Sequence, residues 1–211
     1  MNIFIDLDGT LVDSRRRLYK LFCDLSGSRK LTFHLYWKYK RVARSNEWLL
    51  AQVLGFDAPQ IQAFVRGWLE RIESPEYLAL DAPFGFAQSV LKDLSRDHSL
   101  YVLTARRDEH AARAQIDCAG FTPYLTDMLV TGPWQSKIEL LSARRGQAHS
   151  EDLVVGDTEL DVQAAAAIGA QSVAVLNGFR CRQHLELFKP DFMYADLSAF
   201  HADFFGASLR E

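Results

Sequence analysis

The chain has 211 residues and a formal net charge of −3, from 24 Lys and Arg against 27 Asp and Glu. Apolar residues make up 48% and charged residues 24%, which excludes disordered, collagen-like and coiled-coil classes. The three cysteines (Cys23, Cys118 and Cys181) lack zinc or C-x-x-C spacing, no apolar run reaches membrane-spanning length, and the first residues do not resemble a signal peptide. We therefore expect a cytoplasmic protein with no membrane partner.

Charge is distributed unevenly along the chain. Residues 15–45 contain ten Lys and Arg and a single acid, Asp24, so this stretch carries +9 and the remainder −12. A split of this kind indicates two modules, of which the basic one attracts anions.

The apolar pattern changes twice along the chain. Residues 2–7 form a short apolar run that ends at a turn signal, and residues 15–77 show apolar side chains at helical intervals. From residue 81 onward, helices and strands are expected to alternate. The expected strands are 100–103, 128–130, 153–155, 172–176 and 192–194, and the expected helices are 86–94, 109–119, 136–143, 160–168 and 183–188. The pattern predicts an α/β fold with a doubly wound, mostly parallel sheet, in which residues 1–14 and 82–211 form a Rossmann-like core and residues 15–81 an inserted α-helical cap domain.

Acidic side chains follow two of the expected strands. Asp6 and Asp8 lie at the end of the first strand, where alternation along an extended chain points both carboxylates the same way. Asp157 and Asp161 lie near the start of the helix after strand 153–155, about one turn apart. Aligned carboxylates repel one another and need a cation or a shared proton, and oxygen ligands alone favour a hard ion such as Mg²⁺.

Two further polar residues are expected at the same edge of the sheet. Thr104 ends the second strand with a hydroxyl, and Lys137 opens the helix after the third. Carboxylates, Mg²⁺, a lysine and a hydroxyl together suit phosphoryl transfer. The sequence contains no P-loop and no G-x-G-x-x-G nucleotide fingerprint.

These residues resemble the motifs of the haloacid dehalogenase-like hydrolases. Residues 4–14, which read FIDLDGTLVDS, are similar to the first motif of that superfamily, and Thr104 within VLTAR to the second. Lys137 resembles the third motif, and Gly156-Asp157 followed by Asp161 the fourth. A helical insertion after the first motif resembles the helical-cap subclass, which includes phosphoglycolate phosphatase-like enzymes.

The resemblance implies a role for each residue. Asp6 would attack phosphorus and become an aspartyl phosphate, and Asp8 would act as general acid and then general base. Asp6, Asp8 (through its carbonyl), Asp157 and Asp161 would hold Mg²⁺, and Thr104 and Lys137 the transferring phosphoryl group. Arg106 is a candidate phosphate or substrate contact. The implied activity is a Mg²⁺-dependent phosphatase of small phosphorylated metabolites.

Alternatives remain at this point. Asp8 argues against dehalogenase and phosphonate-cleaving branches, but a sugar-phosphate mutase of the same superfamily stays possible. So does a non-catalytic module that accepts phosphate or binds anions. The basic residues of the cap have three interpretations: steering of an anionic substrate, nucleic-acid binding with aromatic stacking, or a solvated helix face. Nucleic acid is not an expected partner, and the oligomeric state is not visible.

Overall fold

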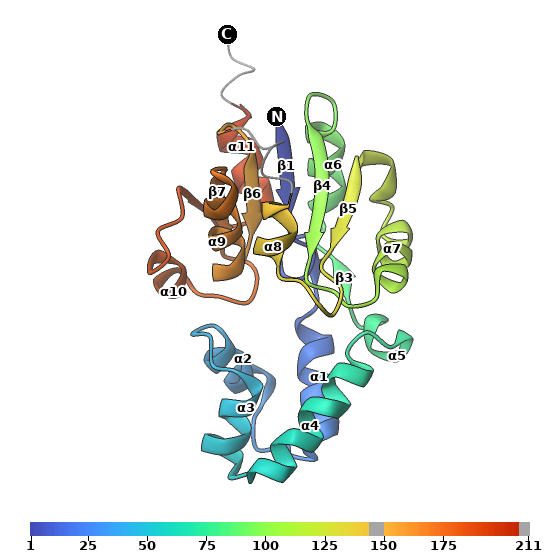
Figure 1. Ribbon diagram of the computed structural model, residues 1–211, viewed down its shortest axis with the longest axis vertical. Helices are drawn as coiled ribbons and strands as arrows, with labels where there is room; N and C mark the ends of the chain where they lie inside the picture. The colour runs from blue at the N-terminus through green and yellow to red at the C-terminus, as the bar shows by residue number, and fades with distance from the viewer. Residues whose placement is uncertain (144–149, 207–211) are drawn as a thin grey trace.

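The computed structural model describes residues 1–143 and 150–206, and in this part of the chain six parallel strands form one sheet (Figure 1). The strand order is β5-β4-β1-β6-β7-β8. The strands are β1 (Asn2–Ile5), β4 (Ser99–Thr104), β5 (Asp127–Val130), β6 (Leu153–Gly156), β7 (Gln171–Val175) and β8 (Phe192–Tyr194). This arrangement confirms the predicted α/β class with a parallel sheet.

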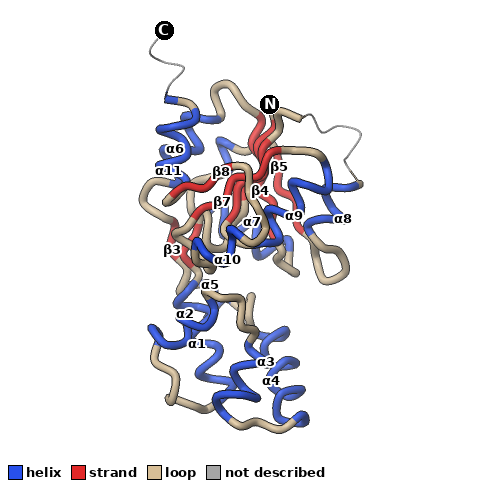
Figure 2. Tube along the Cα trace, turned by 90° about the vertical axis from the view of Figure 1, so that its left-hand side faces the viewer, coloured by secondary structure: helices blue, strands red, loops and turns tan. Residues whose placement is uncertain are grey.

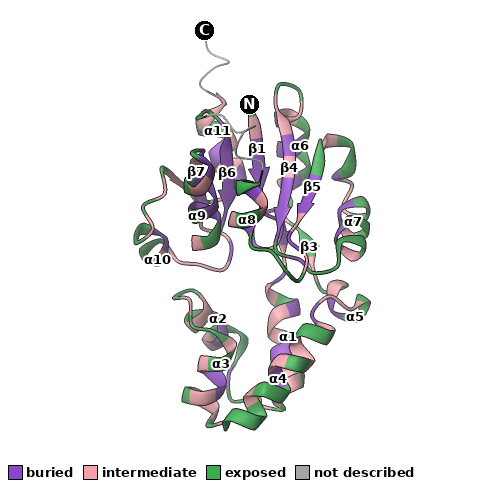
Figure 3. Ribbon diagram, viewed as in Figure 1, coloured by how far each residue is buried: buried purple, intermediate pink, exposed green. Residues whose placement is uncertain are grey.

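Strand β1 lies in the middle of the sheet, between two partners that come much later in the sequence. Ile3 is paired with Leu100 on β4 and with Leu153 on β6. All three strands are largely apolar and buried, as expected for strands covered on both faces (Figure 3).

Helices cover both faces of the sheet (Figure 2). One apolar cluster joins the strands to α6 (Ala87–Leu94), α7 (Glu109–Cys118) and α11 (Leu197–Phe204). A second cluster, on the other face, joins them to α8 (Lys137–Ser142) and α9 (Glu159–Ile168). The short helix α10 (Arg182–Glu186) follows β7. The sheet is thus the middle layer of three.

Most of the residues between β1 and β4 form a helical region, which lies below the sheet in Figure 1. Its elements are α1 (Arg15–Ser26), α2 (Phe33–Lys40), α3 (Asn46–Leu49), a turn of π-helix η1 (Leu50–Leu54), α4 (Ala58–Arg71) and α5 (Pro75–Leu78). The region has its own apolar cluster, which includes Phe22, Tyr36, Trp37 and Phe64. The predicted helical insert is therefore present, and its definition as a separate cap domain over residues 15–81 remains our proposal.

The two connections between the sheet and the helical region run side by side. Strand β2 (Val12–Asp13) pairs antiparallel with β3 (Ala82–Pro83). The sequence does not predict this pair of strands, because each has only two residues, too few to show an alternation of apolar and polar side chains. The predicted strand 2–7 is also too long, because β1 ends at Ile5. A turn follows that contains Gly9, whose φ is +100°. No helix in the described ranges is long and apolar enough to cross a membrane.

Candidate active site

The polar residues predicted to meet at one edge of the sheet follow three adjacent strands. Asp6 comes directly after β1, Asp157 directly after β6, and Thr104 is the last residue of β4. Carboxyl ends of parallel strands share one edge, and the chain reverses its winding direction at β1 and β6. Such a switch point is where open α/β sheets bind ligands.

Three buried carboxylates lie together at this edge. Asp6, Asp157 and Asp161 each offer an oxygen within 4.8 Å of the others. Asp161 lies in the first turn of α9, where its Oδ2 accepts hydrogen bonds from the backbone N–H of Thr158 at 3.1 Å and from the Thr158 hydroxyl at 2.8 Å. These two bonds fix the direction of the Asp161 side chain and leave its second oxygen, Oδ1, to accept from Lys137.

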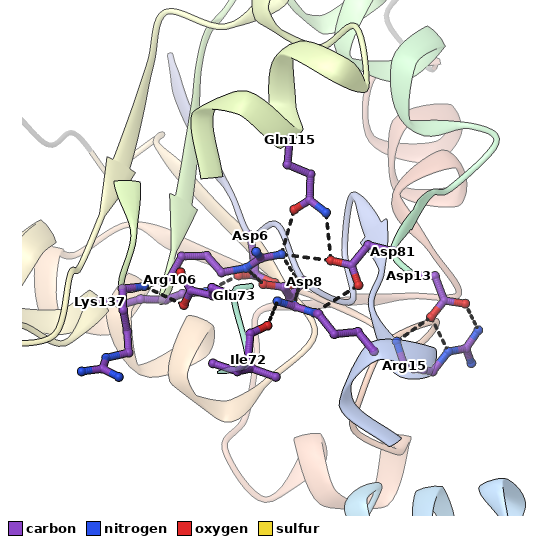
Figure 4. A network of polar contacts seen from close by, with 12 residues as sticks. Asp6, Asp8, Asp13, Arg15, Ile72, Glu73, Asp81, Arg106, Gln115 and Lys137 are labelled. Atoms are coloured by element: carbon purple, nitrogen blue, oxygen red, sulfur yellow. Dashed lines mark hydrogen bonds and ion pairs between the residues drawn. The ribbon is translucent and has the colours of Figure 1, made fainter. Parts of the chain in front are cut away.

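Lys137 bridges two members of this triad. It is the first residue of α8, and a capping box between Ser136 and Glu139 fixes where that helix begins. The buried Lys137 Nζ donates to Asp6 Oδ1 and, at 2.6 Å, to Asp161 Oδ1 (Figure 4 shows the contact with Asp6). Burial opposes the charge on Lys137, but the two acids outweigh burial and raise its pKa.

Three carboxylates surround one cation, Lys137, and the pKa values of Asp6 and Asp157 are raised. Burial, with Asp161 and Asp8 nearby, raises the pKa of Asp6 to about 7 although Lys137 opposes the shift. Burial and the charges of Asp6 and Asp161 raise the pKa of Asp157 well above its ordinary value. The Oδ1 atom of Asp157 is buried and accepts no hydrogen bond. A cluster of buried oxygens with one unpartnered atom and excess negative charge fits a hard divalent cation.

Asp8 lies two residues from Asp6 but faces different partners. Its carboxylate accepts from Arg17 Nη2 at 2.5 Å and from Arg106 Nε and Nη2 at 2.5 and 2.8 Å. Although burial opposes it, the charges of these two arginines hold the pKa of Asp8 well below its ordinary value. The carboxylates of Asp6 and Asp8 therefore do not share one cation, contrary to the expectation from strand alternation, because the extended chain ends at Ile5.

Asp81 completes this second network (Figure 4). Its buried carboxylate pairs with Arg17 Nε at 3.1 Å and with Arg106 Nη2 at 3.2 Å. Arg17 also donates to the carbonyl of Ile72 at 3.2 Å, and Arg106 to Gln115 Oε1 at 2.9 Å. The network therefore ties both connections to the helical region to Asp8.

Arg17 and Asp81 belong to the site although the sequence does not predict them there. Arg17 lies in the basic stretch for which steering, nucleic-acid binding or a solvated face is expected, yet its side chain is only 2% exposed. Arg106, the candidate phosphate contact, is also buried and paired with acids, although its Nη1 has no hydrogen-bond partner. The Asp8 carboxylate is not among the three described acids that cluster, so its part in metal binding would depend on its main-chain carbonyl.

A cavity of about 310 Å³ opens above these groups. Asp6, Asp8, Thr104, Arg106 and Lys137 all line it, so the structure brings these predicted residues together. Asp157 and Asp161 lie beneath them, buried. Of the ten Lys and Arg of the basic stretch, only Arg17 is among the described lining residues.

A loop after β7 connects the acid triad to the helical region. The backbone N–H of Phe179 donates to Asp157 Oδ2 at 2.5 Å, and the Phe179 ring stacks on Trp37 of α2 with centroids 5.3 Å apart. Arg180 donates to the carbonyl of Lys40 at 3.1 Å. Buried Gly178 packs so closely that a Cβ there would lie 2.1 Å from Asp157 Oδ2.

Part of the chain that contains site residues is similar in sequence to known proteins. A family model described as HAD-hydrolase-like matches residues 135–200, which contain Lys137, Asp157 and Asp161. A phosphoglycolate phosphatase of Pectobacterium atrosepticum is 37% identical over 65 residues, which are 31% of this chain and 28% of that protein. The match thus spans under a third of the relative's length.

Solved structures match over nearly the whole chain. A haloacid dehalogenase-like family hydrolase of Streptococcus pneumoniae has a TM-score of 0.79 at 21% identity, with 96% of this chain and 97% of that chain covered. The protein YfnB of Bacillus subtilis, solved with bound magnesium, has a TM-score of 0.65 at 15% identity, with 95% and 96% covered. At these identities the likeness shows the fold. Together the matches confirm the resemblance found in the motifs: the chain is haloacid dehalogenase-like in fold and in its C-terminal sequence, with phosphoglycolate phosphatases among its distant relatives.

Proposed function

We propose that the protein is a Mg²⁺-dependent phosphomonoester hydrolase that forms an aspartyl phosphate on Asp6. The observation that carries the proposal is the position of Asp6 in the cavity lining, where it contacts Lys137 and has an oxygen within 4.8 Å of oxygens of Asp157 and Asp161. Relatives named phosphoglycolate phosphatases and a magnesium-bound structure of the same fold support it.

The proposed metal site consists of the carboxylates of Asp6, Asp157 and Asp161. Mg²⁺ bound there would neutralise charge on the phosphoryl oxygens and keep the acids ionised. Lys137 neutralises part of the negative charge beside Asp6 and is positioned to contact the same phosphoryl group. Thr104 and Arg106 also line the cavity. The Thr104 hydroxyl and the Nη1 of Arg106, which has no partner among the described residues, are further hydrogen-bond donors there.

The chemistry would proceed in two displacements. A carboxylate oxygen of Asp6 attacks phosphorus, the bond between phosphorus and the alcohol oxygen breaks, and Asp8 protonates the departing alkoxide. Asp8, now ionised, takes a proton from water, which attacks phosphorus and releases phosphate and free Asp6. The two arginines favour the ionised form of Asp8, so they suit it to the second step. The first step requires the pairs with Arg17 and Arg106 to loosen when a phosphoryl group enters.

Phosphate release from p-nitrophenyl phosphate and a panel of small phosphomonoesters tests this function. We expect Mg²⁺-dependent turnover that falls at least about 1,000-fold in Asp6→Asn, because that variant lacks the nucleophile. Asp97→Asn, which changes an exposed aspartate outside the cavity, is the matched control and should retain wild-type activity. Wild-type turnover no higher than that of Asp6→Asn across the panel would refute the proposal. Transfer of phosphate within a sugar phosphate, without release, would instead identify a mutase.

A further inference from the structure

The cavity above Asp6 has two chemically different parts. The polar lining residues that are proposed to handle the phosphoryl group are called the floor here. The apolar lining residues are called the walls: Leu18 of α1, Trp68 and Leu69 of α4, Ile72, Leu160 of α9 and Phe179. Thr158, Glu73 and Arg107 also line the cavity, and the last two are called the rim. A bound phosphomonoester with its phosphorus over Asp6 would direct its alcohol portion toward these walls.

Four of the described lining residues carry a cationic side chain, and two of these belong to the buried Asp8 network. The guanidinium of Arg17 is held by Asp8, Asp81 and the carbonyl of Ile72. Arg106 pairs with the same two acids. Two arginines against two carboxylates form a group with no net charge, so the network offers no excess positive charge for a second anionic group on a substrate besides the phosphoryl group.

The other two cations differ: Lys137 is ion-paired, whereas Arg107 is exposed and, among the described rim residues, its charge is balanced only by the neighbouring Glu73. Lys137 lies between Asp6 and Asp161 at the floor. Arg107, at the rim, donates from Nη1 to the carbonyl of Leu69 at 2.9 Å. Beside it lies the carboxylate of Glu73, which accepts the backbone N–H of Arg107 at 2.8 Å. The rim thus presents an acid as well as a base, and the apolar walls offer no charged partner.

We propose that the substrate's alcohol portion is uncharged and apolar, of roughly the size of one ring or a branched alkyl group, and that a carboxylate on it is disfavoured. This inference rests on the proposed phosphatase function and specifies its substrate class. It separates the chain from the activity for which its curated relatives are named, since phosphoglycolate carries a carboxylate on its alcohol portion. A carboxylate against these walls would lose hydration without gaining an ion pair, and the adjacent Glu73 would repel it.

The experiment compares two pairs of compounds that differ only in one remote carboxylate. Binding of benzylphosphonate and 4-carboxybenzylphosphonate, neither of which has a bond to phosphorus that the proposed reaction cleaves, is measured by calorimetry with Mg²⁺. Turnover of benzyl phosphate and 4-carboxybenzyl phosphate is measured in parallel. We expect at least a tenfold preference for the uncharged member in both assays. Equal or stronger binding of the carboxylated phosphonate would overturn the inference.

A charge placed on the wall provides the second arm. Leu69→Lys adds a cation at a lining position that is 47% exposed, and should reduce the preference several-fold. Gln62→Lys adds the same charge at an exposed position of the same helix outside the lining and should leave the preference unchanged. An equal change in both variants would refute the role of the wall. Selective phosphonate binding without turnover of any phosphate would refute the phosphatase function but leave the substrate class standing.

Discussion

Alanine at Gly178 is a sensitive test of how the acid triad is held. Gly178 packs against Asp157, so a Cβ there would lie 2.1 Å from Oδ2 and 2.5 Å from the Cβ of Asp157. Ordinary contacts between such atoms are at least 3.4 Å, so Asp157 must move by more than an ångström or the loop must shift away from it. Either movement breaks the 2.5 Å hydrogen bond from the Phe179 N–H.

The expected effect is on metal affinity more than on folding. Disturbing the support of a metal ligand costs roughly 10- to 100-fold in affinity. Overpacking of this size also lowers stability by about 1–3 kcal/mol, which leaves most domains folded at 25 °C. We therefore expect Gly178→Ala to raise the Mg²⁺ concentration for half-maximal phosphate release by roughly 10- to 100-fold.

The assay is a Mg²⁺ titration of phosphate release, with calorimetric Mg²⁺ binding as an activity-independent readout. Gly85→Ala is the matched control, because a Cβ at Gly85 meets no atom within 4 Å. If Gly178→Ala required no more Mg²⁺ than the wild type, or Gly85→Ala shifted the titration equally, the reasoning about Asp157 would be wrong.

Three further predictions concern stability. In EDTA, the raised pKa values of Asp6 and Asp157 mean that the folded state binds more protons than the unfolded state, so the melting temperature should fall as pH rises from 5 to 8. Asp157→Asn should melt higher than the wild type at pH 8 in EDTA and lose the stabilisation by Mg²⁺; a lower melting temperature would contradict the like-charge explanation. Arg17→Met should lower the free energy of unfolding by about 3–5 kcal/mol, because it leaves two buried carboxylates with one arginine. Arg16→Met, at the exposed neighbouring position, should change it by less than about 0.5 kcal/mol in a urea titration, and equal effects would refute the difference.

The parts of this structure that could be predicted from sequence are those with a local signal. Apolar runs separated by helical periods identified the strands of the sheet, and the rule that parallel strands share a carboxyl edge brought Asp6, Thr104 and Asp157 together. Lys137 followed from its position at a helix start. Each of these predictions needed only the residue type and its place relative to one strand or helix.

The features that were missed depend on contacts between distant segments. Arg17 and Asp81 form one network with Asp8, but neither has a pattern around it that distinguishes it from a surface charge. The tripeptide Arg15-Arg16-Arg17 is uniform in sequence, yet only Arg17 is buried. Arg17 lies in the first turn of the predicted insert and Asp81 is its last residue, and this placement was the available sign that the two lie close together. The pairing of β2 with β3 brings the two ends of the insert side by side.

The central position of β1 has a consequence for how the protein is made. β1 and Asp6 are synthesised well before the strands that flank β1, which begin at Ser99 and Leu153. Pairings so distant along the chain form slowly, and until then β1 is an apolar segment with two open edges. Asp6 meets Asp157 and Asp161 only after α9 has been synthesised. A nascent chain that lacks β6 and α9 therefore cannot assemble the acid triad proposed to bind the metal.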